Sequence, residues 1–307
     1  MVIACGMDIG TNSFRLLVAE IKDGRPHPLT QDRVTVRLGE ELGTSGLIGP
    51  AAMLRGEAAL VRLAGKLASY SLQSLRVCAT HAVRKASNKQ DFLRMAERTT
   101  GVSIEVLSGE EEGRLVLQGT LAALPEELRR YPLVLVDVGG GSTEIIFQEK
   151  AESEPQVISL GLGAIGLTEE FGENLDAMGE KIRTTLAPAL GNTCAREMVG
   201  QTSLLIASGG TATTLAALAL GLDRYDGPRV QNYPLSQDSL HRLLAELSTC
   251  PSGERNNLPC LSNGRGKIIM AGAMILQEVR KALAFPDLLV SDAGLLEGIL
   301  LSGAMGC

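Results

Sequence analysis

Several features typical of nucleic-acid-binding and membrane proteins are missing from this sequence. Its 307 residues include no Trp, and aromatic residues make up only 3%. Proteins that bind single-stranded nucleic acids stack the bases on aromatic side chains, so this composition argues against DNA as a partner. No apolar run reaches the roughly 18 residues that a membrane-spanning helix requires, and we therefore expect no membrane segment.

An export signal and paired cysteine motifs are missing as well. The opening MVIACGMDIG has no basic region followed by an apolar stretch and leads directly into a Gly-rich turn, unlike a signal peptide. The six cysteines form no Cys-x-x-Cys pair, and without an export signal they are expected to be reduced thiols. These features predict a cytoplasmic protein.

Charge is present but unevenly distributed. The net charge is −6, yet residues 1–122 hold 15 basic and 13 acidic side chains, a net charge of +2. The other residues hold 14 basic and 22 acidic side chains, a net charge of −8. The N-terminal half is the better host for a polyanion, although a chance distribution of solvated charges explains the asymmetry equally well.

Alternating strand and helix patterns place the chain in the α/β class. Its length favours two domains, and we predict them at 1–122 and 123–307, with the last helix allowed to pack back on the first domain. Two Gly/Pro/Asn-rich segments, 221–236 and 250–266, are expected to be surface loops or cleft rims. The expected strands are 2–8, 14–21, 33–38, 76–80, 103–107, 133–138, 143–148, 155–160, 204–208 and 287–291. The expected helices are 50–72, 90–99, 108–123, those within 163–200, 211–221, 236–248, 266–283 and one from 294.

An internal repeat relates the two halves. DIGTNSFRLL at 8–17 matches DVGGGSTEII at 137–146, with Asp, Gly, Ser and the closing apolar pair in register at an offset of 129. Each copy lies where one strand turns into the next, and the glycines let backbone N–H groups face a ligand. The repeat predicts a duplicated pair of domains, which usually enclose a cleft.

The two repeated hairpins suit a phosphate-transfer site, because backbone N–H groups and hydroxyls bind phosphate oxygens. Asp8 and Asp137 each end an apolar strand and offer the hard oxygen ligands that a divalent cation prefers. One such hairpin would more often be a plain polar turn, whereas two in register favour a site.

Six blocks spread over nearly the whole chain resemble the exopolyphosphatase and guanosine pentaphosphatase family. That family is a branch of the sugar kinase, heat-shock chaperone and actin superfamily. The resemblance implies two duplicated actin-like, ribonuclease H-like α/β domains with an interdomain cleft. Larger members continue into an all-helical C-terminal domain, so this chain is similar to the short, two-domain form. The blocks are DIGTNSFRLLV at 8–18, ATHAVRKASN at 79–88, LSGEEEGRLVLQGT at 107–120, LVDVGGGSTEIIF at 135–147, SLGLGAIGLTEEF at 159–171 and ASGGTATTLAAL at 207–218.

The resemblance implies three loops that bind phosphate or a nucleotide. The first falls on Asp8, Gly10, Thr11, Asn12 and Ser13, and the second on Asp137, Gly139, Gly140, Gly141, Ser142 and Thr143. The third falls on Gly209, Gly210 and Thr211, where a strand-to-helix turn without a ligand is the alternative.

The resemblance also assigns charged residues. Glu112 falls on the general base that takes a proton from the attacking water, with a solvated first helical turn as the alternative. Asp137 and Glu144 fall on ligands of Mg²⁺ or its water, with Asp8 as a third, although strand alternation alone would leave Glu144 exposed. Arg84 falls on a phosphate-binding Arg, suited to two-pronged contacts.

Other residues are weaker candidates. Arg15 and Arg37 would extend the polyanion path, Lys85 would add positive field, and His81 has no second His or Cys at metal-ligand spacing.

Two positions depart from the family pattern. Lys267 stands where an acidic residue is usual, and Leu296 stands where Arg is usual. These departures concern contacts between the lobes rather than the phosphate loops.

The implied function is an exopolyphosphatase that releases orthophosphate from inorganic polyphosphate, with Glu112 as base and Mg²⁺ as cofactor. The sister activity, conversion of pppGpp to ppGpp, uses the same groups, and the sequence does not separate the two substrates. A small-molecule kinase or ATPase is disfavoured because the Glu triplet stands where its catalytic Asp is expected. A non-catalytic phosphate or nucleotide sensor is disfavoured by the intact acidic residues. The oligomeric state stays open, with a homodimer as one candidate.

Overall fold

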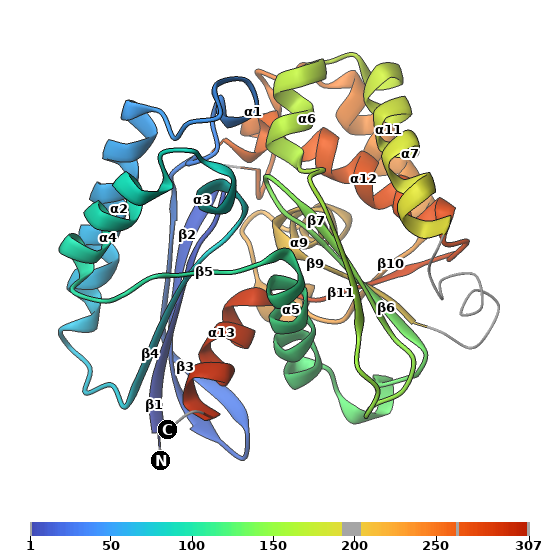
Figure 1. Ribbon diagram of the computed structural model, residues 1–307. Coiled ribbons are helices and arrows are strands. Elements are labelled where there is room, and N and C mark those ends of the chain that lie inside the picture. The colour runs from blue at the N-terminus through green and yellow to red at the C-terminus, as the bar shows by residue number, and fades with distance from the viewer. Residues whose placement is uncertain (1, 192–203, 262–263, 306–307) are drawn as a thin grey trace. The chain divides into compact units, whose positions relative to one another are not determined.

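The computed structural model describes residues 2–191, 204–261 and 264–305 (Figure 1). The chain divides into two compact units, Met1–Ala123 with Gly294–Cys307, and Leu124–Ala293. The last helix therefore belongs to the first unit, one of the two arrangements that the sequence left for it. Part of the helical region expected within 163–200 lies outside the described residues.

A five-stranded sheet in the order β3-β2-β1-β4-β5 forms the centre of the first unit. Its first three strands pair antiparallel, β4 runs parallel to β1, and β5 runs parallel to β4. Apolar residues on both faces of the central strands bury the sheet between two layers of helices. The strands are β1 (Val2–Ile9), β2 (Ser13–Lys22), β3 (Arg25–Thr35), β4 (Ser74–Ala79) and β5 (Glu105–Val106).

Alternate side chains of β1 and β2 pack on opposite faces of this sheet. Met7 and Leu16 lie in a core cluster with α2 (Pro50–Leu67) and α4 (Lys89–Thr100). On the other face, Ala4 and Leu17 pack against α13 (Leu295–Met305), which in turn contacts α5 (Gly109–Ala123). The short helices α1 (Leu42–Ser45) and α3 (His81–Lys85) complete the unit.

A six-stranded sheet in the order β10-β11-β9-β6-β7-β8 forms the centre of the second unit. Strands β6, β7 and β8 pair antiparallel, and β9 and β11 continue the sheet in parallel, which repeats the arrangement from β1 to β5. The predicted duplication of an α/β domain is confirmed. The strands are β6 (Leu133–Val138), β7 (Thr143–Gln148), β8 (Gln156–Leu160), β9 (Leu204–Ser208), β10 (Tyr233–Leu235) and β11 (Leu288–Val290).

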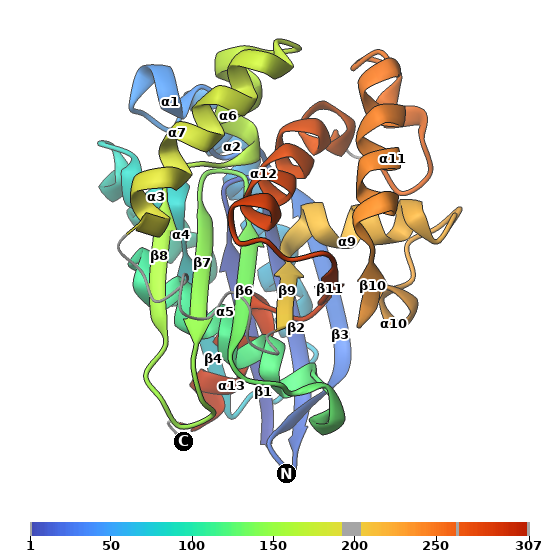
Figure 2. The ribbon, with the colours of Figure 1, turned by 90° about the vertical axis from the view of Figure 1, so that its right-hand side faces the viewer.

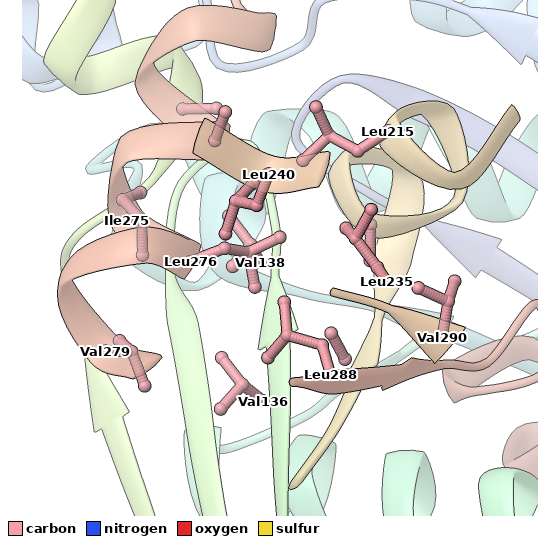
Figure 3. Close-up of a cluster of buried hydrophobic side chains, with 14 of the residues drawn as sticks. Val136, Val138, Leu215, Leu235, Leu240, Ile275, Leu276, Val279, Leu288 and Val290 are labelled. Atoms are coloured by element: carbon pink, nitrogen blue, oxygen red, sulfur yellow. The ribbon is translucent and has the colours of Figure 1, made fainter. Parts of the chain in front are cut away.

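Helix α12 lies between α7 and α11 over the second sheet (Figure 2). Its apolar side chains meet those of β6, α9, α11 and β11 in one buried cluster, part of which is shown in Figure 3. The helices are α6 (Ala164–Phe171), α7 (Leu175–Gly191), α9 (Gly209–Ala219), α10 (Gly227–Val230), α11 (Gln237–Thr249) and α12 (Ile269–Ala282), with short 3₁₀ turns η1 (Glu126–Leu128), η2 (Arg255–Asn257) and η3 (Arg265–Lys267).

Several predicted boundaries are wrong. The third strand runs from Arg25 to Thr35 rather than over 33–38, because Val36 and Leu38 leave the sheet to enter the core. The predicted loop 221–236 contains α10 and β10.

The predicted surface loop 250–266 also differs from expectation. It carries Arg255, which is only 1% exposed and binds Glu173 through both terminal nitrogens. The buried Arg255 therefore anchors this segment to exposed Glu173 in the turn between α6 and α7.

Candidate active site

In the first hairpin an acidic residue, Asp8, lies beside a basic residue, Arg15. Asp8 ends β1 and lies opposite Arg15 of β2, whose Nε and Nη2 atoms both lie 2.8 Å from Asp8 Oδ2. Asp8 is 3% exposed, and its Oδ1 atom has no hydrogen-bond partner among the described residues. Burial raises the pKa of Asp8, although the charge and hydrogen bond of Arg15 act in the opposite direction.

The turn of this hairpin is held on one side by the segment after β3. The N–H groups of Val36 and Arg37 donate to the carbonyl of Asn12 at 2.9 and 2.8 Å, and Gly39 N–H donates to the carbonyl of Thr11 at 3.0 Å. Arg37 adopts a left-handed conformation with φ 53°, which costs about 1–2 kcal/mol in a non-glycine residue. The turn is therefore fixed by a strained neighbouring segment rather than by the hairpin alone.

The predicted base Glu112 lies in the first turn of α5. Ser108 and Glu111 cap this helix reciprocally, as the sequence predicts, with N–H to side-chain distances of 2.8 and 3.1 Å. Glu112 itself is only 6% exposed. A solvated first-turn residue is therefore excluded for Glu112.

Arg84 holds this buried carboxylate. Its Nη1 atom lies 3.0 Å from Glu112 Oε2 and donates to the carbonyl of Leu107 at 2.6 Å. The predicted phosphate-binding Arg is thus bonded to the predicted base, a pairing that the sequence analysis did not anticipate.

Neighbouring strand ends bring these residues to one edge of the first sheet. Thr80 N–H donates to the carbonyl of Ile9 at 3.2 Å, and Leu107 N–H donates to the carbonyl of Ala79 at 3.0 Å. The hairpin, α3 and α5 therefore follow the carboxyl ends of three adjacent strands, β1, β4 and β5. In α/β sheets this edge is the usual position of ligand sites.

The second hairpin places two acids side by side. Asp137 of β6 lies opposite Glu144 of β7 in the antiparallel register. Ser208 Oγ donates to Asp137 Oδ1 at 2.8 Å, and Ser159 Oγ donates to Glu144 Oε1 at 2.7 Å. Glu144 is 1% exposed, so the alternative of a solvent-facing strand residue is wrong.

The turn of the second hairpin leans on α6. The first N–H groups of that helix, at Ala164 and Ile165, donate to the carbonyls of Gly139 and Gly140 at 3.1 and 2.8 Å. Thr143 Oγ1 donates to the carbonyl of Leu162 at 2.6 Å. Thr143 is therefore bound within the protein, while Gly140, Gly141 and Ser142 form the tip.

The third loop lies directly beside Asp137. Gly209 has φ +86°, and a Cβ atom there would lie 2.6 Å from Asp137 Oδ1, so no larger residue fits. A Cβ atom on Gly210 would lie 2.5 Å from Arg265 Nη2, and Arg265 Nη1 donates to Thr214 Oγ1 at 2.7 Å. Thr211 is buried against α12 at Gly272.

Sequence reasoning missed Ser159, Ser208 and Arg265 as functional residues. Both serines lie inside motifs that the sequence analysis quoted, but their importance depends on strand register. Asp137 faces Ser208 across the β6–β9 pair, and Glu144 faces Ser159 across the β7–β8 pair. Correct alignment of these strands from the sequence would have identified both serines as neighbours of the acids.

The remaining candidates have varied surroundings. His81 is partly buried, and burial together with the positive charges of Arg84 and Lys85 lowers its pKa to about 4. Lys85 and Lys267 are exposed. Leu296 is 1% exposed in the apolar contact between α13 and the first sheet, so it is a core residue of the first unit.

Each unit thus presents a distinct chemical group. The first offers a buried carboxylate fixed by a guanidinium, which is the arrangement of an oriented general base. The second offers two adjacent carboxylates, each bound by a serine hydroxyl, which is suited to a hard cation.

The chain is similar to known proteins along nearly its whole length. The chain is 30% identical to Exopolyphosphatase 2 of Mycobacterium tuberculosis, with 96% of this chain and 97% of that protein covered. The crystal structure of an exopolyphosphatase-like protein superimposes with a TM-score of 0.92 at 26% identity, covering 99% of this chain and 98% of that one. A Ppx/GppA family member from Aquifex aeolicus gives a TM-score of 0.79 at 27% identity, again covering 99% and 98%.

The neighbours confirm the expected actin-like fold with two α/β domains. The model of the Ppx/GppA phosphatase family matches residues 17–305, from the second strand to the last helix. Because this match spans most of the chain and a relative is 30% identical over 96% of it, this chain belongs to the Ppx/GppA phosphatase family.

Proposed function

We propose that this protein is an exopolyphosphatase, which hydrolyses the terminal anhydride bond of inorganic polyphosphate and releases orthophosphate. Family membership and the exopolyphosphatase relatives support hydrolysis of phosphoric anhydrides. The single observation that carries the mechanism is the pairing of Arg84 with buried Glu112 at the carboxyl edge of the first sheet.

Glu112 acts as the general base. It accepts a proton from the attacking water, and Arg84 keeps its carboxylate in one orientation, so that no reorientation is needed during the reaction. Backbone N–H groups at the tips of the two turns, at 11–12 and 140–142, bind phosphate oxygens. The N–H groups of Gly10 and Gly139 instead close the turns by donating to the carbonyls of Ser13 and Ser142 at 3.2 and 2.9 Å.

Mg²⁺ is the proposed cofactor, held by Asp137 and Glu144. The described residues contain no group of three or more His, Cys, Asp or Glu side chains that would hold a metal alone. Mg²⁺ usually takes only one or two carboxylates and fills its other positions with waters and substrate phosphates. The cross-strand acids fit this pattern. When bound, the ion would neutralise charge on phosphate oxygens.

Hydrolysis of pppGpp is the second candidate function. The observation that favours it is Arg265, whose guanidinium lies against Gly210 at the start of α9. An arginine at a helix N-terminus supplies an additional anion-binding element beyond the two hairpins.

Phosphate release from polyphosphate and from pppGpp, measured side by side, tests both functions. We expect Glu112→Gln to reduce turnover by about 10²–10⁴-fold, the usual contribution of a general base, with little change in KM. Glu110→Gln is the matched control, because Glu110 is exposed and accepts a hydrogen bond from Arg114 of the same helix. Retention of more than about a tenth of turnover in Glu112→Gln would exclude Glu112 as the base. Transfer of labelled phosphate to an acceptor other than water would overturn the hydrolase assignment.

A further inference from the structure

The outer face of α2 is an exposed apolar stripe. Ala51, Leu54, Ala58, Val61 and Gly65 are all exposed and recur at alternating spacings of three and four residues. Leu54 is 67% exposed and Val61 is 59% exposed. Leu47, three residues before the helix, is another exposed apolar residue, 44% exposed.

This face lacks the polar residues that a solvent-facing helix normally carries. Glu57 and Arg62 are its only exposed charged residues. All three basic residues of the helix, Arg55, Arg62 and Lys66, form ion pairs with Glu40 or Asp32 of the same unit. The apolar stripe is therefore not screened by the charges of its own helix.

Gly65 gives an independent indication of a partner. A glycine within a helix costs about 1 kcal/mol relative to alanine, and a Cβ atom at Gly65 would meet nothing within 4 Å. Its own unit therefore gives no steric reason for a glycine there. Absence of a side chain would, however, allow a second helix to approach closely.

The stripe has the spacing of a two-helix seam. Ala51, Ala58 and Gly65 occupy one heptad position and Leu54 and Val61 the other, which is the a and d pattern of paired helices. With 100° per residue, Glu57 and Arg62 lie about 70° to either side of the stripe's centre. They therefore flank the seam on opposite sides, as the g and e residues of a heptad do.

We propose that α2 packs against α2 of a second copy of this chain, with the two helices parallel about a two-fold axis. In this arrangement Glu57 approaches Arg62 of the partner subunit, five residues further along, and symmetry repeats the ion pair. An antiparallel pair would instead bring like flanks together, Glu57 to Glu57 and Arg62 to Arg62. The charges thus select both the partner and the direction.

Arg62 is held in place by its own unit and keeps Nη1 for a further contact. Its Nε and Nη2 atoms donate to Asp32 at 3.1 and 2.9 Å, which fixes the guanidinium. Glu57 has no ion-pair partner among the described residues. The 18 residues of α2 span about 27 Å, and one helix pair offers less than the roughly 1,200 Å² of a standard interface. The association should be weak, with Kd on the order of 1–100 μM, and sensitive to salt.

Sedimentation velocity of the full chain over a concentration series tests the surface. We expect reversible dimers, and Leu54→Glu should raise the dimer Kd at least about tenfold by placing a charge in the seam. Leu29→Glu is the matched control, because Leu29 is also an exposed leucine of this unit, 47% exposed, but lies on β3. Monomers at every concentration, or equal loss of dimer in both variants, would overturn the proposal.

Charge exchange and cross-linking test the direction. Glu57→Arg and Arg62→Glu should each weaken dimerisation, whereas the double variant and an equimolar mixture of the two single variants should restore it. A single Ala58→Cys should form a 58–58 disulfide under mild oxidation, identified by peptide mapping, while exposed Lys85→Cys should not. Single charge variants without effect, or cross-linking only in Ala58→Cys/Val61→Cys, would indicate antiparallel helices and overturn the proposed pairing. Unchanged circular dichroism melting curves would show that the variants remain folded.

Discussion

The two hairpins have the same backbone arrangement but opposite charge patterns. Asp8 faces Arg15 in the first, and Asp137 faces Glu144 at the equivalent register position in the second. The neighbouring parallel strand presents Cys78 to Asp8 and Ser208 to Asp137. The repeat has therefore kept one acid in each unit while changing both of its neighbours.

The different partners of Asp8 and Asp137 give the two hairpins different net charges. In the first hairpin the guanidinium of Arg15 neutralises Asp8 within the protein. In the second, buried Glu144 lies beside partly buried Asp137, and their negative charge is costly unless hydroxyl donors and a cation compensate it. The proposed magnesium site therefore lies in the second hairpin.

Giving the second hairpin the charge pattern of the first should have the largest effect. Glu144→Arg would pair with Asp137 and remove the cation site, so we expect turnover on polyphosphate to fall by about 10³-fold or more, which corresponds to about 4 kcal/mol. Glu144→Gln should show a smaller loss, and exposed Glu149→Gln on the same hairpin should behave like wild type. Mg²⁺ titration after chelation provides the measurement. Full activation of Glu144→Arg by Mg²⁺ would contradict the assignment.

The reciprocal change should destabilise the first unit. Arg15→Glu would leave buried Asp8 beside a like charge. Breaking a buried pair costs about 3–5 kcal/mol, reduced here to about 2–4 kcal/mol because the Arg15 side chain is 30% exposed. Urea unfolding followed by circular dichroism would measure the loss. Exposed Arg25→Glu, on the neighbouring strand β3, is the control and should unfold at the wild-type midpoint. Equal midpoints for both variants would show that the Asp8–Arg15 pair contributes nothing.

The serine beside Asp137 should have an intermediate effect. Ser208→Ala removes the hydroxyl that orients Asp137, and loss of such a supporting group typically weakens metal affinity by about 10–100-fold. The reciprocal Cys78→Ser in the first unit should leave that affinity unchanged. Burial raises the pKa of Cys78 to about 12, so this residue is a neutral thiol beside Asp8. Calorimetric titration with Mg²⁺ distinguishes the two, and equal affinities in Ser208→Ala and wild type would refute the role of Ser208.

Much of the fold was predictable because its signals are local. The repeat at offset 129 predicted the duplicated hairpins, and apolar runs predicted most strands. Boundaries failed where tertiary packing decided them, as at residues 36–38, which leave the sheet to bury Val36 and Leu38. The segment around Arg255 looked like a polar loop because its partner Glu173 lies far away in the sequence.

For the site, too, the sequence predicted local features but not contacts between separated segments. Residues within the hairpins were identified as candidates, but the environment of Glu144 was not, because strand alternation cannot show that the other side of β7 is also covered. The pairing of Arg84 with Glu112 and the two serine contacts depend on strand ends and registers that bring separated segments together.

The smallest expected effect concerns the turn after the central parallel strand. Three residues after Cys78 stands His81, and three residues after Ser208 stands Thr211, which does not titrate. Burial first, then the charges of Arg84 and Lys85, lower the pKa of His81 from 6.5 to about 4 in the folded protein. Between these pH values the unfolded chain binds more protons than the folded protein. The stabilising contribution of neutral His81 is therefore complete above pH 6.5 and is lost as the pH falls toward 4.

His81→Gln should remove this pH dependence while keeping a polar side chain of similar size. We expect the difference in unfolding free energy between wild type and variant to change by about 1–2 kcal/mol from pH 7 to pH 4.5, less than the full shift implies because His81 retains some solvent access. Urea midpoints measured across this range give the difference, in which the titration of shared carboxylates cancels. His241→Gln, on the exposed face of α11, should follow the wild-type profile. If the His81→Gln profile instead runs parallel to wild type, the turn in the first unit is as insensitive to pH as its threonine-bearing counterpart in the second.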